Sequence, residues 1–467
     1  MGRLNQIYKI SLWGGFAVLL ILYFISSFEK AITYNRIPFL LYTIMISVLY
    51  LFIYRRKNIF CYETFFLLLF IISAFFYDIV INNMIDTSSV IAAYYNADFS
   101  RRVENKGVII NTISLVVFLM AATRINEQTP RTIVGSFIID RNFSLSINIL
   151  SVICGLYIAY LGGTGIISSW FRYSNVISEY TNTHIVYLTI IFLVLTALEF
   201  SRLSVRKCSN FRDFLKFVNK IYLGETICLV LLLLISGNRN ECLLILLPMI
   251  VSYHIFIKPF NNKQFLLLLL VGILTMVMVG LTRQSGTLSS LKEESINLYD
   301  ITRDFGFVDK NTKYMIEYTD KNSPIGFKNA LLTIFSSIPF LGGLFVAATG
   351  VSSDLRSTEL TTQGMQMSYN MDSGLGTSLL GDLYYTGGFL FTLLFMYFLG
   401  WLMAKLNMQF TVQKRYNIWS LIVYLFMFSN VVYYIRAEWT MPFRYIGFSF
   451  IILLVLSIFQ PRKKYIR

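Results

Sequence analysis

Charged residues are scarce in this chain of 467 residues. They make up 14% of the sequence and hydrophobic residues make up 56%, whereas an average soluble domain has about 25% charged residues. Apolar runs of about 18 residues or more recur along the whole length, and each is long enough to cross a bilayer as a helix. An outer-membrane barrel is excluded, because its strands would alternate in polarity over about ten residues. The sequence therefore predicts an all-α polytopic membrane protein.

Histidine and cysteine are also rare. The two histidines, His184 and His254, belong to no HExxH or other ligand spacing, which argues against a catalytic metal. The five cysteines form no CxxC pair, so neither a zinc site nor a disulfide framework is expected. We predict no metal and no cofactor.

Basic residues are in clear excess, with 40 Lys and Arg against 25 Asp and Glu. In a soluble protein this would suggest nucleic acid as a partner, but in a membrane protein such residues hold loops in the cytoplasm. We therefore expect the bilayer as a partner and no nucleic acid. The first apolar run, Ser11–Ser26, lacks a small-residue cleavage site after it, which predicts a retained span rather than a signal peptide.

Twelve membrane spans fit the hydropathy pattern best. They cover residues 8–27, 37–54, 64–82, 107–123, 147–162, 185–199, 222–236, 241–257, 264–282, 376–401, 417–433 and 443–459. With the N-terminus inside, more than half of the 40 basic residues lie on the predicted cytoplasmic connections, as the positive-inside rule requires. Both termini are therefore predicted to be cytoplasmic.

One predicted outer connection, residues 284–371, is much longer than the others. Within it, residues 329–349 are semi-apolar and are broken by Pro339, Gly342 and Gly343. A full span there would invert every later segment and place the basic tail outside, so we expect a re-entrant or surface-lying segment. The predicted organisation is nine spans in residues 1–283, one long extracytoplasmic loop in residues 284–371, and three spans with a tail in residues 372–467.

Arginines at the predicted outer face are the main binding candidates. Guanidinium groups bind phosphate oxygens through paired hydrogen bonds and stay charged; the alternative is an interfacial arginine that snorkels or pairs with a nearby acid. Arg239 stands out because it lies in the short polar connection Ser236–Glu241 between two apolar runs, where charge is costly. The full set is Arg239, Arg283, Arg303, Arg356, Arg436 and Arg444.

Carboxylates close to these arginines are the candidates for a general base. Glu241 follows Arg239 by two residues, and Asp372 and Asp382 flank the glycine-rich start of span ten. A structural Arg–Glu pair is the alternative for Glu241. Asp78 and Glu225 fall inside predicted spans, where packing hydrogen bonds are the simpler interpretation.

The glycine-rich run spans residues 372–388 and contains Gly374, Ser378 and Gly381 at helical spacing. Small residues at this spacing permit close helix contact in a membrane, and an exposed helix start there would also attract an anion. The tyrosines Tyr384 and Tyr385 in this run could line the face of a sugar.

Two stretches resemble the bacterial O-antigen polymerase (Wzy) family. One is Ser236-Gly237-Asn238-Arg239-Asn240-Glu241 with the following apolar span that contains Pro248; the other is Gly374–Gly388 leading into span ten. The order of many spans, a late outer loop and a few closing spans is also similar, although Gly381 and Gly387 depart from the expected pattern. The resemblance implies a membrane glycosyltransferase with a GT-C-like fold.

The resemblance implies that this chain polymerises undecaprenyl-diphosphate-linked oligosaccharide units into O-antigen or a related surface polysaccharide. The resemblance implies that this happens on the outer face of the bacterial inner membrane, with release of undecaprenyl diphosphate and without metal. Arg239 would bind the donor diphosphate, and Glu241 or Asp372 would act as base. A chain-length regulator membrane protein is a further candidate partner.

Two other functions remain open from the sequence. A flippase for lipid-linked oligosaccharide would be expected to carry cations within its spans, which here are nearly free of Lys and Arg. An O-antigen ligase would be expected to use a histidine in the outer loop, and residues 284–371 contain none.

Overall fold

The computed structural model describes residues 2–26, 34–56, 58–76, 99–127, 144–164, 167, 180–206, 208–236, 238–272, 298–336, 341–350, 356–369, 376–411 and 417–458. All regular structure in these ranges is helical, with no strand. The chain divides into two compact units, each built from segments that lie far apart in the sequence.

Unit 1 comprises residues 1–129, 296–405 and 431–444. Its helices are α1 (Gly2–Ser26), α2 (Ile37–Tyr54), α3 (Tyr62–Ala74), α5 (Arg101–Glu127), α13 (Leu298–Asn322), α14 (Lys328–Ser336), α15 (Leu341–Thr349), α16 (Ser357–Tyr369), α17 (Leu379–Thr411, in this unit as far as Lys405), α19 (Val431–Tyr434) and the first turn of α20 (Met441–Ile458).

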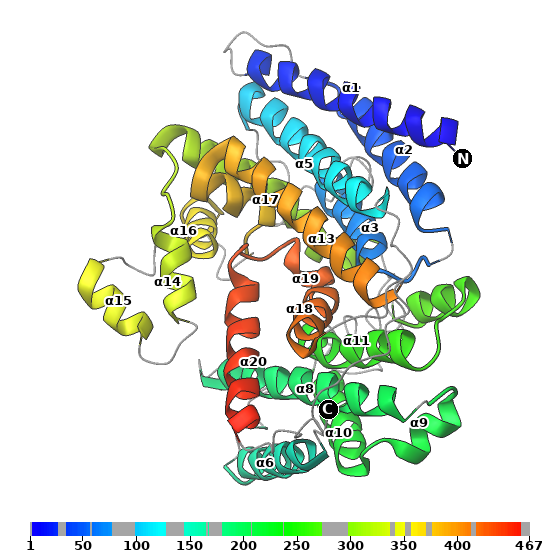
Figure 1. Ribbon diagram of the computed structural model, residues 1–467. Coiled ribbons are helices and arrows are strands. Elements are labelled where there is room, and N and C mark those ends of the chain that lie inside the picture. The colour runs from blue at the N-terminus through cyan, green and yellow to red at the C-terminus, as the bar shows by residue number, and fades with distance from the viewer. Residues whose placement is uncertain are drawn as a thin grey trace, which may run out of the picture. The chain divides into compact units, whose positions relative to one another are not determined.

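Helix α5 is the centre of unit 1 and packs against α1, α2, α3 and α13 (Figure 1). In its most apolar stretch 89% of the residues are buried, compared with 22% in α1. Helix α17 approaches it closely, because a Cβ atom at Gly400 would lie 2.3 Å from the carbonyl oxygen of Phe118 in α5. A small residue at this position thus lets the two backbones meet.

Unit 2 comprises residues 130–295, 406–430 and 445–467. Its helices are α6 (Ser144–Gly163), α8 (Tyr180–Val205), α9 (Phe211–Phe217), α10 (Lys220–Ile235), α11 (Arg239–Phe256), α18 (Ile418–Ser429) and the remainder of α20. Helix α8 packs against α6, α11 and α18 and forms the core of this unit.

Seven described helices are long and apolar enough to cross a membrane, and the bent pair α9–α10, with an angle of 108°, would make an eighth span. The prediction of an all-helical membrane protein is therefore confirmed. Four predicted spans coincide with apolar helices shorter than 18 residues in the described part of the chain: Tyr62–Ala74, Glu241–Phe256, Asn262–Gly272 and Ile418–Ser429. The count of twelve stays a prediction.

The predicted outer loop contains helices. Its semi-apolar segment comprises α14 and α15, which pack on each other through the stacked rings of Phe335 and Phe345. Earlier in the loop, α13 is strongly amphipathic and packs against α3, α5 and α16. The position of these helices relative to the membrane surface stays a prediction.

Candidate functional site

Three segments of unit 1 meet at the start of α17. They are residues 356–361 at the start of α16, residues 376–386, and the connection 435–440 between α19 and α20. The amide of Leu379 donates to the carbonyl of Ile435 at 2.9 Å, and the indole Nε1 of Trp439 donates to Thr386 Oγ1 at 3.0 Å. These bonds fix the connection against the start of α17. We call the side chains Arg356, Ser357, Thr358, Asp382 and Glu438, which lie at this junction, the Asp382 cluster.

Gly376 explains how the chain enters this junction. Its φ of +72° is a left-handed conformation that favours glycine. Its carbonyl accepts hydrogen bonds from Thr361 Oγ1 at 2.5 Å and from Asn311 Nδ2 at 3.3 Å. The turn before α17 is therefore tied to both α16 and α13.

Two carboxylates lie at the centre of the Asp382 cluster. Asp382 is 1% exposed, and its Oδ2 accepts the backbone N–H of Trp439 at 2.8 Å. The other oxygen, Oδ1, is buried and makes no hydrogen bond to the described residues, although the Ser357 hydroxyl lies beside the carboxylate. Glu438 lies within electrostatic range of Asp382, is only half-buried, and accepts a hydrogen bond from Thr358 Oγ1 at 2.9 Å.

Three arginines lie in the same unit as these acids. Arg356 lies within electrostatic range of Asp382. The buried Nε atoms of Arg356 and Arg444 have no hydrogen-bond partner among the described residues. Arg436 lies two residues before Glu438, with its guanidinium 5.8 Å from the ring centre of Tyr433. The junction thus combines cations that can take an anionic ligand with carboxylates that can take a proton.

A second set of charges lies on α13, where five consecutive polar residues, 309–313, are almost fully buried. Asp309 pairs with Arg36 at 2.8 Å and with Lys313 at 2.9 Å, and Lys313 also pairs with Glu104 of α5 at 2.7 Å. Burial opposes ionisation of Asp309, but Arg36 and Lys313 outweigh it and lower its pKa to about 2. These ion pairs hold α13 against α5 and against the segment before α2.

Burial, reinforced by the charge of Lys313, lowers the pKa of the adjacent Lys310 to about 8, because a buried ammonium group loses its hydration. The ammonium lies 5.4 Å from the ring centre of Phe99. Residues 309–313 thus place two lysines and one aspartate inside unit 1.

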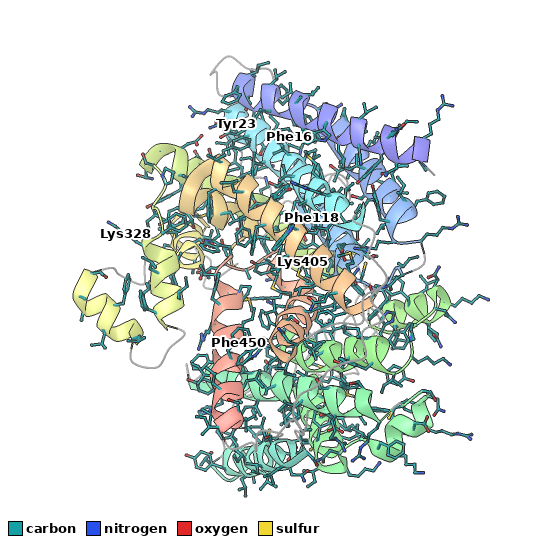
Figure 2. All side chains as sticks on the ribbon, viewed as in Figure 1. Phe16, Tyr23, Phe118, Lys328, Lys405 and Phe450 are labelled. Carbon is teal, nitrogen blue, oxygen red and sulfur yellow. The ribbon has the colours of Figure 1, made fainter. Side chains whose placement is uncertain are left out.

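Towards its end, α13 is held by Asp320. The carboxylate accepts hydrogen bonds from Lys106 Nζ at 2.6 Å and from the hydroxyl of Tyr384 at 2.8 Å, and Arg102 lies 3.3 Å away. The Tyr384 hydroxyl is also 3.2 Å from that of Tyr23, which lies near the end of α1 (Figure 2). Tyr384 thus links α17 to α1, α5 and α13.

Among the described residues, no three His, Cys, Asp or Glu side chains gather closely enough to hold a metal ion. Comparison with protein-family models matches residues 16–465 to the family described as O-antigen polysaccharide polymerase Wzy. The chain belongs to this family. Comparisons with curated proteins and with solved structures gave no match.

As a Wzy family member, the chain is a multi-pass membrane glycosyltransferase that polymerises O-antigen repeat units carried on a lipid. Its predicted site residues fall in both units. Arg356, Arg436 and Arg444 belong to unit 1, as do Tyr384 and Tyr385, which are 4% and 2% exposed. A role for these tyrosines in holding sugar stays a prediction, since both are packed inside the unit.

The other predicted residues are less fully described. Arg239 is the first residue of α11 and Glu241 lies in its first turn, both in unit 2. The side chains of Arg239 and Arg303, and the whole of Arg283 and Asp372, lie outside the described residues. Their roles stay predictions.

Glu438 and the buried charges Asp309, Lys310 and Lys313 of α13 were not predicted from the sequence. One signal was available for Glu438, because it lies two residues after Arg436 in the short connection between two apolar segments. The partners of α13 carried no such signal, since Asp309 and Arg36 are 273 positions apart.

Proposed function

We propose that this Wzy family member transfers a growing glycan from undecaprenyl diphosphate to a hydroxyl group of an incoming lipid-linked repeat unit. The bond between the anomeric carbon and the diphosphate oxygen breaks, its electron pair leaves with undecaprenyl diphosphate, and the acceptor oxygen takes its place on the sugar. The Asp382 cluster with Arg436 and Arg444 is the observation that carries this proposal, because it brings anion-binding and proton-accepting groups together in one unit.

The arginines supply what the leaving group needs. Negative charge develops on the diphosphate as the sugar departs, and fixed cations stabilise that charge without reorganising. Each charged hydrogen bond contributes about 1.5–3 kcal/mol. Arg356 and Arg444 suit this task, since their Nε donors are unused among the described residues, and the reaction then needs no metal.

The reaction would take place on the outer face of the bacterial inner membrane, with both termini in the cytoplasm. The charge distribution over the connections supports this orientation. We propose separately that Arg239 contacts the donor diphosphate. Full-length polysaccharide from both Arg239→Ala and Arg239→Lys, at normal membrane levels, would contradict that role.

The test of the function is reconstitution of the purified protein in liposomes with undecaprenyl-diphosphate-linked repeat units and a metal chelator. We expect a ladder of longer glycans and one undecaprenyl diphosphate released for each linkage formed. Arg444→Ala should slow the ladder roughly 10- to 100-fold, the equivalent of about 1.5–3 kcal/mol. Arg212→Ala, which removes an exposed cation of α9 in unit 2, should leave it unchanged. No ladder, or one that requires added divalent metal, would contradict the proposal.

A further inference from the structure

We propose that Glu438 is the base that takes the proton from the acceptor hydroxyl group. This inference deepens the proposed function and rests on it. The polymerase must remove one proton per linkage, and the carboxylate that receives it must be both accessible and held in place. Four observations in unit 1 point to Glu438.

The first is the anchoring of its backbone. Ile435, Ala437 and Trp439 are buried, whereas Arg436 and Glu438, which alternate with them, are half-exposed. Trp439 donates its backbone N–H to Asp382, its indole N–H to Thr386, and accepts the hydroxyl of Tyr434 at its carbonyl at 3.0 Å. Glu438 is therefore carried by a connection fixed on both sides.

The second is the orientation of its carboxylate. Thr358 Oγ1 donates to Oε1 at 2.9 Å, which leaves Oε2 with no hydrogen bond from the described residues. A carboxylate with one oxygen fixed and the other available can accept a proton without losing its position.

The third is the burial of the polar groups that neighbour Glu438. The side chains of Asp382 and Ser357 are 1% and 0% exposed, and the Ser357 hydroxyl lies beside the Asp382 carboxylate. Neither group is accessible to an acceptor sugar, whereas Glu438 is half-exposed. Glu438 is therefore the accessible carboxylate of the Asp382 cluster.

The fourth is that side chains of both charges lie close together in the Asp382 cluster. Arg356 lies within electrostatic range of Asp382, and Asp382 within range of Glu438. Asp382 is too buried to meet a substrate directly and acts as a positioning residue by holding the Trp439 backbone.

Glu438 receives the proton while the acceptor oxygen attacks the anomeric carbon and the diphosphate leaves with the electron pair. The proton later passes from Glu438 to water.

The decisive comparison is Glu438→Gln against wild type in the liposome assay, with kcat and the donor KM measured separately. Glutamine keeps the shape and can still accept the hydrogen bond from Thr358, but it cannot take the proton. We expect kcat to fall about 10²- to 10⁴-fold and the donor KM to stay within about threefold, since the donor diphosphate is held by arginines. Glu438→Asp should recover part of the rate. The matched control, Glu317→Gln, removes a partly exposed carboxylate of α13 that pairs with Lys321 and should leave kcat unchanged.

A kcat for Glu438→Gln within about threefold of wild type would overturn the role of Glu438 while the wild-type ladder still upheld the polymerase. An absent wild-type ladder would instead overturn the proposed function. If Glu438→Gln does not accumulate in the membrane, Thr358→Val decides the matter, because it removes only the orienting hydroxyl. We then expect a kcat about tenfold lower, and an unchanged kcat would overturn the proposal.

Discussion

Replacing Asp309 by Asn should destabilise unit 1 more than any exposed charge change on the same helix. Asp309 is 1% exposed and is shared by Arg36 and Lys313, whose side chains are 15% and 1% exposed. Asparagine keeps the shape and can still accept the hydrogen bond that Asn111 Nδ2 donates at 3.2 Å. The substitution therefore removes the charge and replaces Oδ2, the acceptor for Arg36 and Lys313, by an amide donor.

Two physical effects set the loss of unfolding free energy in Asp309→Asn. A carboxyl whose pKa is about 2 in the folded protein and about 3.9 when unfolded contributes about 2.6 kcal/mol when ionised. Breaking a buried ion pair by removing one partner costs about 3–5 kcal/mol, because a buried charge loses its compensation. Both lead us to expect a loss of about 3 kcal/mol.

The assay is thermal or denaturant unfolding of the purified protein in detergent, with Glu317→Gln as the matched control. Glu317 also lies on α13 and pairs with Lys321 at 2.8 Å, but their side chains are 32% and 69% exposed, and such surface pairs contribute about 0–1 kcal/mol. Asp309→Asn should lower the unfolding midpoint clearly, whereas Glu317→Gln should shift it little. Equal shifts in the two variants would refute the view that buried charges hold α13 in place.

The Asp309 carboxylate should also make the free energy of unfolding depend on pH. Because the pKa of Asp309 is lower in the folded state than in the unfolded one, its contribution is complete above about pH 4. It is lost as the pH falls from there towards 2. The difference in stability between wild type and Asp309→Asn should therefore be constant from pH 7 to pH 5 and should shrink only below about pH 4.

Two further substitutions test the packing around α17. Tyr384→Phe removes the hydroxyl that donates to Asp320 and contacts Tyr23, and it should lower the free energy of unfolding in denaturant by about 1.5–3 kcal/mol. The control is Tyr314→Phe, on a half-buried residue of α13. An equal loss in the control would contradict the role of the Tyr384 hydroxyl. Gly400→Ala places a methyl group 2.3 Å from the Phe118 carbonyl oxygen and should cost about 1–3 kcal/mol by overpacking. A Cβ at Gly447 would meet nothing within 4 Å, so a Gly400→Ala variant as stable as Gly447→Ala would show that α5 and α17 do not approach closely.

The sequence was sufficient to predict helices and membrane crossing, because long apolar runs have few other solutions. The prediction for residues 37–54 coincides with α2 (Ile37–Tyr54), and that for residues 443–459 nearly coincides with α20 (Met441–Ile458). The positive-inside rule also predicted an orientation and a long outer loop, and both stay predictions.

Tertiary pairing could not be predicted in the same way. Residues 298–322 are polar in sequence, and no local feature of α13 reveals that Asp309 and Lys313 are buried against Arg36 and Glu104. Similarly, Asp382 suggested a base from its position beside a glycine-rich run, but only the structure shows it buried and bonded to Trp439, with Glu438 more accessible beside it. Charges paired across hundreds of residues leave no periodicity to detect.

The most direct measurement of the central claim is photocrosslinking of an undecaprenyl diphosphate analogue, with the reactive group beside the diphosphate, followed by mapping of the modified peptides. We expect modification within residues 356–361, 376–386 or 435–444 of unit 1, reduced by unlabelled lipid-linked repeat units. Modification confined to residues 220–256 of unit 2, with none at the junction around Asp382, would contradict it.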